Sequence, residues 1–90
     1  MKRIFKFPIP VTDHVQLLLP TGSRILSVMN QREQVVVYAL VEDATLQKET
    51  WLVEIRGTGH PAMGLEDFQF VGTVEIAGAL MFHVFARRVG

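Results

Sequence analysis

Hydrophobic and polar residues alternate in short runs along most of the chain, which is the pattern of half-buried β-strands. The clearest case is the segment 50–56, where Trp51, Val53 and Ile55 share one face of a predicted strand and polar residues take the other. The other strands are predicted over residues 2–7, 14–19, 24–30, 35–41, 68–76 and 79–87. Seven strands at this spacing predict an all-β fold of about seven antiparallel strands, a compact sandwich or a small barrel.

Turn residues separate these runs. Proline lacks the N–H that a sheet ladder needs, so Pro8-Ile9-Pro10 is predicted to end the first strand. Residues 20–23 and the polar residues 31–34 are predicted to be turns, and residues 46–48 a single helical turn. Ala77-Gly78 has the length of a tight hairpin turn, although alanine fits a left-handed conformation poorly.

Two predicted strands, 35–41 and 79–87, are apolar on both faces. Since a single core can cover only one face of each, the second face predicts a protein–protein interface, most simply a homodimer or a higher oligomer. The predicted interface residues are Tyr38, Met81, His83 and Phe85. In the strand 68–76, Phe68, Phe70, Val74 and Ile76 are predicted to share one face.

Composition narrows the class of protein. Ninety residues predict a single β-domain spanning 1–90, and 49% of them are hydrophobic. The sequence offers no apolar run of the roughly 18–20 residues that a spanning helix needs, and it has no cysteine. We therefore expect a cytoplasmic protein, in the host cell cytoplasm, without a membrane partner. Nine basic and nine acidic residues cancel, which disfavours nucleic acid as a partner.

The candidate binding site is the turn after the strand 50–56. Two glycines separated by one residue let consecutive backbone N–H groups point the same way and form a nest for an anion, to which arginine and histidine would add charge. The predicted ligand-binding residues are Arg56, Gly57, Thr58, Gly59 and His60. The alternative is a purely structural turn at the end of the strand.

Catalytic and metal sites are not predicted. A nucleophile would have to be Ser23 or Ser27, and neither lies in the sharp strand-to-helix turn that activates a serine. The spacing of His14, His60 and His83 does not match the paired short spacings of zinc motifs. We therefore expect no enzyme, no cofactor and no metal.

Six blocks follow one another along nearly the whole chain: residues 5–10, 19–28, 38–41, Gly57-Thr58-Gly59-His60-Pro61, 71–74 and His83-Val84-Phe85. In these blocks the chain resembles a family of small proteins encoded by tailed bacteriophages and prophages. The resemblance implies no activity and no catalytic residue, because the family is known only as a domain of unknown function.

These observations favour a non-enzymatic accessory protein of the phage type that interferes with a host defence system. It would act by sequestering a small phosphorylated, nucleotide-like signal or by binding a host protein. One alternative is a virion or assembly component whose strand edges pair with copies or partners. A nucleic-acid-binding module is a weaker alternative.

Overall fold

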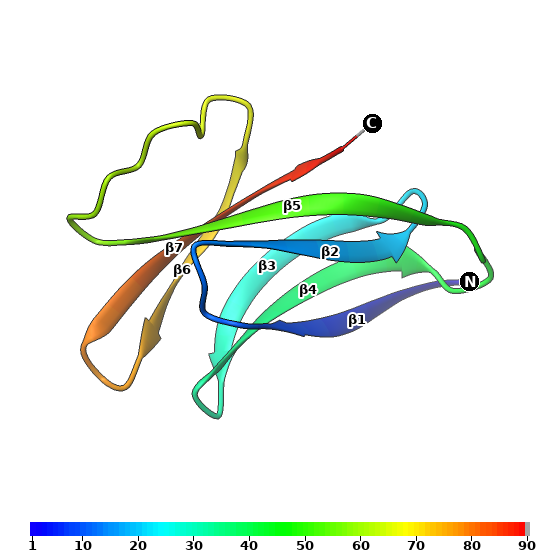
Figure 1. The fold of residues 1–90 in the computed structure, drawn as a ribbon. Helices are drawn as coiled ribbons and strands as arrows, with labels where there is room; N and C mark the ends of the chain where they lie inside the picture. The colour runs from blue at the N-terminus through cyan, green and yellow to red at the C-terminus, as the bar shows by residue number, and fades with distance from the viewer. Residues whose placement is uncertain (90) are drawn as a thin grey trace.

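The fold is a sandwich of two antiparallel sheets. In a computed structural model that describes residues 1–89, seven strands form and no helix does, so the predicted all-β fold is confirmed. The sheets have the orders β1-β4-β3 and β2-β5-β7-β6 (Figure 1). The strands are β1 (Lys2–Ile9), β2 (His14–Pro20), β3 (Arg24–Gln31), β4 (Gln34–Glu42), β5 (Lys48–Gly57), β6 (Gln69–Ile76) and β7 (Leu80–Arg88).

The core lies between the inner faces of the two sheets. Alternate residues of β4 and β5 point inward, as the period of two in a strand requires, and they meet in the middle of the molecule. The buried core residues are Ile9, Leu19, Val35, Val37, Ala39, Val41, Trp51, Val53, Ile55, Val74, Val84 and Ala86.

None of the described residues belongs to a helix that is long and apolar enough to cross a membrane.

The prediction that Pro8-Ile9-Pro10 ends the first strand is wrong. Strand β1 continues to Ile9, and Pro8 lies opposite Val36 of β4. The amide of Asp43 donates to the carbonyl of Met1, so the odd-numbered residues of β1 exchange hydrogen bonds with β4. The even-numbered Pro8 points its nitrogen away from β4, where the missing N–H costs no ladder bond.

The prediction that Phe68 and Phe70 share a face with Val74 is also wrong. A β-bulge lies between Phe70 and Gly72, so that one extra residue, Val71, shifts the alternation. Phe70 pairs with the outward-facing Phe85 and is 55% exposed, whereas Val74 is buried in the core. A single inserted residue thus moves an aromatic ring from the core to the surface.

Two tight turns lie side by side at one end of the sandwich. Arg32 and Glu33 connect β3 to β4, and Ala77 and Gly78 connect β6 to β7, with positive φ angles at all four residues. The predicted loop 31–34 is therefore shorter, because Gln31 and Gln34 belong to the strands. The Glu33 carboxylate accepts a hydrogen bond from the Ala77 amide at 2.6 Å, which ties the two turns together.

The predicted helical turn at residues 46–48 does not form. Leu46 and Gln47 lie in the connection between β4 and β5, and Lys48 is already the first residue of β5. The carbonyl of Gln47 accepts a hydrogen bond from the Thr21 amide at 2.9 Å, which continues the pairing of β2 with β5. This pairing fixes residue 47 in an extended conformation.

Charged groups cluster where β1 begins and β4 ends. The N-terminal ammonium of Met1 contacts the carboxylates of Glu42 and Asp43, and Arg3 contacts Asp43. The hydrogen bond from the ammonium to Glu42 raises the pKa of the ammonium above 8.0, and the bond to Asp43 adds to this effect. The ammonium lowers the pKa of Glu42 below 4.5, and Arg3 lowers that of Asp43 below 3.8.

This cluster predicts a pH dependence of stability. Carboxylates with depressed pKa values stabilise the fold above their ordinary pKa, and that contribution is lost as the pH falls. The ammonium, whose pKa is raised, stabilises the fold below its ordinary pKa and loses this effect as the pH rises. We expect the double variant Glu42→Gln/Asp43→Asn to have a lower Tm than the native chain between about pH 5 and pH 8. At more acid or more alkaline pH the difference in Tm should be smaller. A gap in Tm that is constant from acid to alkali would contradict this.

Candidate functional site

The predicted binding turn borders a hollow on the surface. Residues 58–60 follow directly on β5, and a depression of about 360 Å³ lies on one side of them. It is lined by Asp13, His14, Ile55, Arg56, Gly57, His60 and Pro61. Three of the five predicted ligand-binding residues therefore come together at one hollow, and they share it with the connection between β1 and β2.

Arg56 is bound to its own chain in this hollow. Its Nη2 donates to Glu54 Oε1 at 2.9 Å, and its Nη1 donates to the carbonyls of Asp13 and Ile55 at 3.2 Å. The side chains of Arg56 and Glu54 are both only 18% exposed. The guanidinium is thus paired with a carboxylate and two carbonyls, and an anionic ligand would have to compete with the Glu54 carboxylate.

The backbone of the turn is also engaged. The amide of Thr58 donates to the Met81 carbonyl at 3.2 Å, and the amide of His60 donates to the Gly57 carbonyl at 3.1 Å. Gly59 has a positive φ of 86°, whereas Gly57 lies outside the left-handed region. Two of the amides expected in the anion nest thus bond within the protein, and the geometry resembles a structural turn more than a nest.

His83 links three segments of the second sheet. Its Nε2 lies 2.7 Å from Thr58 Oγ1, and its Nδ1 lies 2.9 Å from Thr73 Oγ1. A neutral imidazole donates through one nitrogen and accepts through the other, so each hydroxyl takes the complementary role. The sequence analysis did not predict this bridge. The hydrogen-bond partners of His83 depend on the strand register that pairs Thr73 with His83, which local sequence patterns do not reveal.

The four predicted interface residues do not form one surface. Tyr38 lies on the outer face of the β1-β4-β3 sheet, where its hydroxyl lies 3.5 Å from Gln31 Oε1. Met81, His83 and Phe85 alternate with the buried Val84 and therefore lie on the outer face of the other sheet. A single twofold contact between flat faces cannot include all four.

Aromatic rings lie on the part of the outer face of the β2-β5-β7-β6 sheet that β6 and β7 form. The rings of Phe70 and Phe85 lie with centroids 5.4 Å apart, and the Arg87 guanidinium lies 5.6 Å from the centroid of Phe68. Phe82, by contrast, packs against the core. Among residues 1–89, no three His, Asp or Glu side chains gather as metal ligands.

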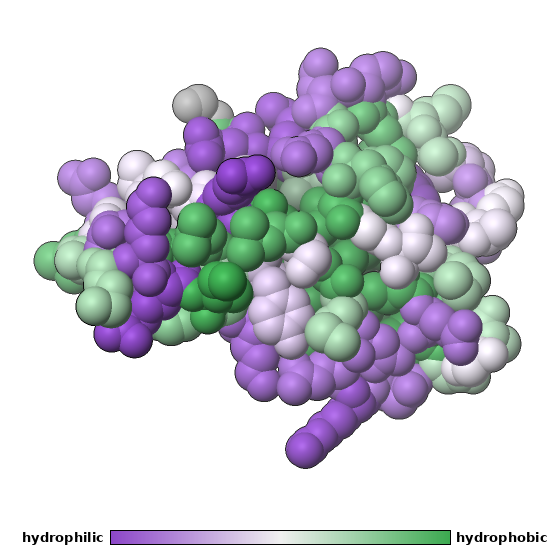
Figure 2. All heavy atoms as spheres, turned by 180° about the vertical axis from the view of Figure 1, so that it is seen from behind, coloured by the Kyte–Doolittle hydropathy of each residue, from purple (hydrophilic) through white to green (hydrophobic). Residues whose placement is uncertain are grey.

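The outer face of the β1-β4-β3 sheet carries a second candidate surface. We use the term apolar face for the outward-facing residues Ile4, Pro8, Met29, Val36, Tyr38 and Leu40. Ile4 is 60% exposed and Met29 is 48% exposed. In Figure 1, β2 and β5 pass in front of β3 and β4, so this sheet is turned to the back, and Figure 2 shows hydrophobic side chains joined across that side.

Basic residues surround the apolar face. Lys2 and Lys6 lie on β1, Arg24 lies on β3, and Arg32 lies in the turn after it. None of the four is in an ion pair with another of the described residues. Glu42, an acidic residue on this face, is paired with the Met1 ammonium. The apolar face thus has a rim with an excess of positive charge.

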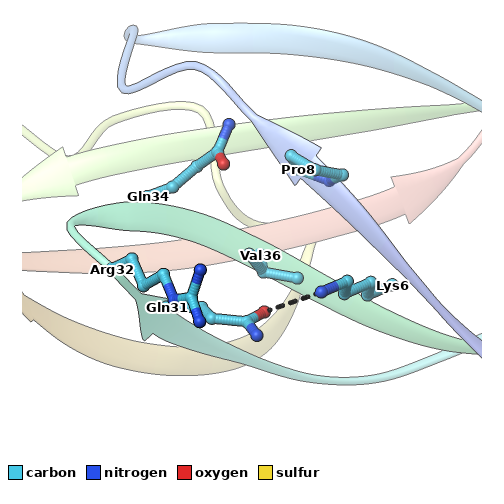
Figure 3. A pocket seen from close by; sticks show the side chains of 6 residues that line it. All are labelled: Lys6, Pro8, Gln31, Arg32, Gln34 and Val36. Atoms are coloured by element: carbon cyan, nitrogen blue, oxygen red, sulfur yellow. Dashed lines mark hydrogen bonds between the residues drawn. The ribbon is translucent and has the colours of Figure 1, made fainter.

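A hollow of about 310 Å³ lies at the edge of the apolar face. Figure 3 shows its lining, in which Lys6 and Arg32 lie on either side of Gln31 and the apolar side chains of Pro8 and Val36 lie beside them. Lys6 Nζ donates to Gln31 Oε1 at 3.4 Å, which is a long bond that a stronger acceptor can replace. The hollow therefore combines apolar contact with two cations.

Comparison with known proteins assigns the chain to a family. A family model described as a domain of unknown function (DUF7352) matches residues 1–90. The chain belongs to this family. No curated protein and no solved structure matches it significantly. The DUF7352 match covers both candidate surfaces, the turn after β5 and the apolar face, and it carries no activity that would decide between them.

Proposed function

We propose that this protein is a non-enzymatic binding protein and that it binds a host protein through the apolar face. The observation that carries the proposal is the combination of exposed hydrophobic side chains with unpaired cations around them. Exposed Ile4 and Met29 are large enough to anchor a partner, and large apolar patches rimmed by polar groups are typical of interaction sites. The cationic rim fits a partner with acidic residues around a hydrophobic centre.

The biological setting is the finer part of the proposal. The blocks that resemble small proteins of tailed bacteriophages and prophages support a phage accessory protein that acts in the cytoplasm of its host. Small phage proteins without an enzyme motif often block a host defence system. Under this proposal the acidic partner is a component of such a system.

A small phosphorylated signal is the second candidate ligand. The hollow of about 360 Å³ beside the turn after β5 supports it, since Arg56 and His60 both line that hollow. The ion pair of Arg56 with Glu54 weighs against it, because a phosphate would have to displace a carboxylate already bound at 2.9 Å. We therefore rank protein binding first.

Binding through the apolar face predicts the effect of single substitutions. We expect Ile4→Glu or Met29→Glu to weaken binding to the host partner by about tenfold or more, because each places a negative charge against an acidic surface and removes an apolar anchor. The partner is first identified by crosslinking in host cells, and its affinity is then measured with purified components. Met63→Glu is the matched control, since Met63 is 81% exposed in the loop before β6.

The same purified protein distinguishes the two candidates. If Met29→Glu and Met63→Glu bind the partner equally well, the apolar face is not the binding surface. If native mass spectrometry instead finds a nucleotide-sized mass retained by the chain and lost in Arg56→Ala, the second candidate takes precedence. The salt dependence of the affinity provides a further check, because a cationic rim makes association weaker at high salt.

A further inference from the structure

The sandwich has two open sheet edges, formed by β1 and β2. The other two edge strands, β3 and β6, pack against each other, and Asn30 Nδ2 of β3 donates to the Glu75 carbonyl of β6 at 2.7 Å. Within residues 1–89, β1 pairs only with β4, and β2 pairs only with β5. The remaining side of each strand presents unpaired backbone groups.

The hydrogen bonds at both ends of β2 establish which of its residues face the open edge. The Ile55 amide donates to the Asp13 carbonyl, and the Thr21 amide donates to the Gln47 carbonyl. In an antiparallel pair these bonds recur at every second residue, so Val15, Leu17 and Leu19 bond to β5. The backbone N–H and C=O of His14, Gln16 and Leu18 therefore point away from β5, and the His14 carbonyl accepts a hydrogen bond from the Thr12 hydroxyl.

The two open edges differ in how they are protected. On β1 the residues whose backbone faces the open side are Lys2, Ile4, Lys6 and Pro8, and lysines and proline are the usual means of blocking an edge. Strand β2 contains no Lys, Arg, Asp or Glu, and its exposed Leu18 is 61% accessible. Pro20, at the end of β2, lacks an N–H for pairing, but the rest of this edge can form hydrogen bonds and carries no formal charge that would repel a second strand.

We propose that β2 pairs antiparallel with β2 of a second copy of the chain, about a twofold axis at Gln16. In this register Gln16 lies opposite Gln16 of the second copy, and His14 lies opposite Leu18. A register centred on Leu17 would place Pro20 at a position that must donate, which proline cannot do. The proposed register leaves Pro20 outside the pairing.

A second copy fits this edge for two reasons. First, a twofold pairing places residues of β2 opposite other residues of β2, and none of them carries a formal charge, whereas the same pairing of β1 about Ile4 would place Lys2 opposite Lys6. Second, the Gln16 side chain both donates and accepts, so two copies of it can bond to each other across the axis. The pairing would join two four-stranded sheets into one of eight strands. It is independent of the proposed partner at the apolar face.

Opposite charges at position 16 test the proposal. We expect the native chain to be a dimer by light scattering coupled to size-exclusion chromatography. Gln16→Lys and Gln16→Glu should each raise the dimer dissociation constant about fivefold or more, because like charges then face each other directly. An equimolar mixture of the two variants should form dimers again, since each Lys then faces a Glu. Met63→Lys, in an exposed loop, is the control and should dimerise like the native chain.

Hydrogen exchange on the native chain provides a second measurement that needs no variant. The amides of Gln16 and Leu18 should exchange slowly in the dimer and faster on dilution, although neither has a partner among residues 1–89 of its own chain. A native chain that stays monomeric at its highest attainable concentration overturns the proposal. Three other results would also overturn it. These are an unchanged dimer dissociation constant in both charge variants, an equimolar mixture of the variants that stays monomeric, and a dimer in which the Gln16 amide exchanges freely.

Discussion

We expect Leu19→Ala to lower the free energy of unfolding by about 3 kcal/mol, which lies within the range for a fully buried leucine. Leu19 is 0% exposed and is the last inward-facing residue of β2, where it packs within the core between the two sheets. Removing three carbon atoms there leaves a cavity that the close-packed valines around it fill only in part. For a domain of this size the loss corresponds to a fall in Tm of about 4–8 °C for each kcal/mol.

Urea unfolding followed by tryptophan fluorescence measures this effect, because Trp51 lies in the same core. Leu46→Ala is the control with the same chemical change, since Leu46 is 91% exposed in the connection between β4 and β5. We expect it to change the stability by less than about 0.5 kcal/mol. Equal losses for the two variants would mean that Leu19 is not in the core.

Gly72→Ala is expected to destabilise the fold by about 1–3 kcal/mol through overpacking. A Cβ at Gly72 would lie 2.9 Å from Val28 Cγ1, closer than carbon atoms approach without a shift. Gly72 follows the bulge in β6, and Val28 lies on β3, so the contact is at the seam where the two sheets meet. The added methyl group would push these edge strands apart.

A double-mutant cycle tests this explanation. Val28→Ala makes room at the seam, so Gly72→Ala should cost less in that background than in the native chain. The measured quantity is the free energy of unfolding of the four proteins. Strictly additive losses would contradict the steric explanation, because they would mean that the added methyl group does not press on the Val28 side chain.

Local patterns in the sequence were sufficient to predict the strands. Alternation at Trp51, Val53 and Ile55 predicted the inward face of β5, because the period of a strand is two wherever one face is buried. The short link Ala77-Gly78 predicted a tight turn for the same local reason. Features that depend on the partner strand were missed. The tolerance of Pro8 follows from its position at an edge, and the bulge at Val71 follows from the register with β7.

The candidate site was predicted only in part. Its arrangement depends on which residues of neighbouring strands lie opposite one another, and the sequence does not show this. Gly57 and His60 line the same hollow as Arg56, and ligand binding there stays a prediction. The ion pair of Arg56 with Glu54 had a visible signal, since residues two apart in a strand share a face. Tyr38 and Phe85 were grouped because both lie on doubly apolar strands. The sequence does not reveal that these strands belong to different sheets.

The order of strands in the sheets affects how the chain is made. Strand β1 has no partner until β4 exists, and β2 has none until β5 exists. During synthesis both N-terminal strands therefore leave the ribosome well before they can pair, while the hairpin β3-β4 forms from neighbouring residues. The run Leu17-Leu18-Leu19 stays uncovered throughout this interval. We therefore expect this nascent segment to be a target for chaperones, and slower translation after residue 20 to increase its capture.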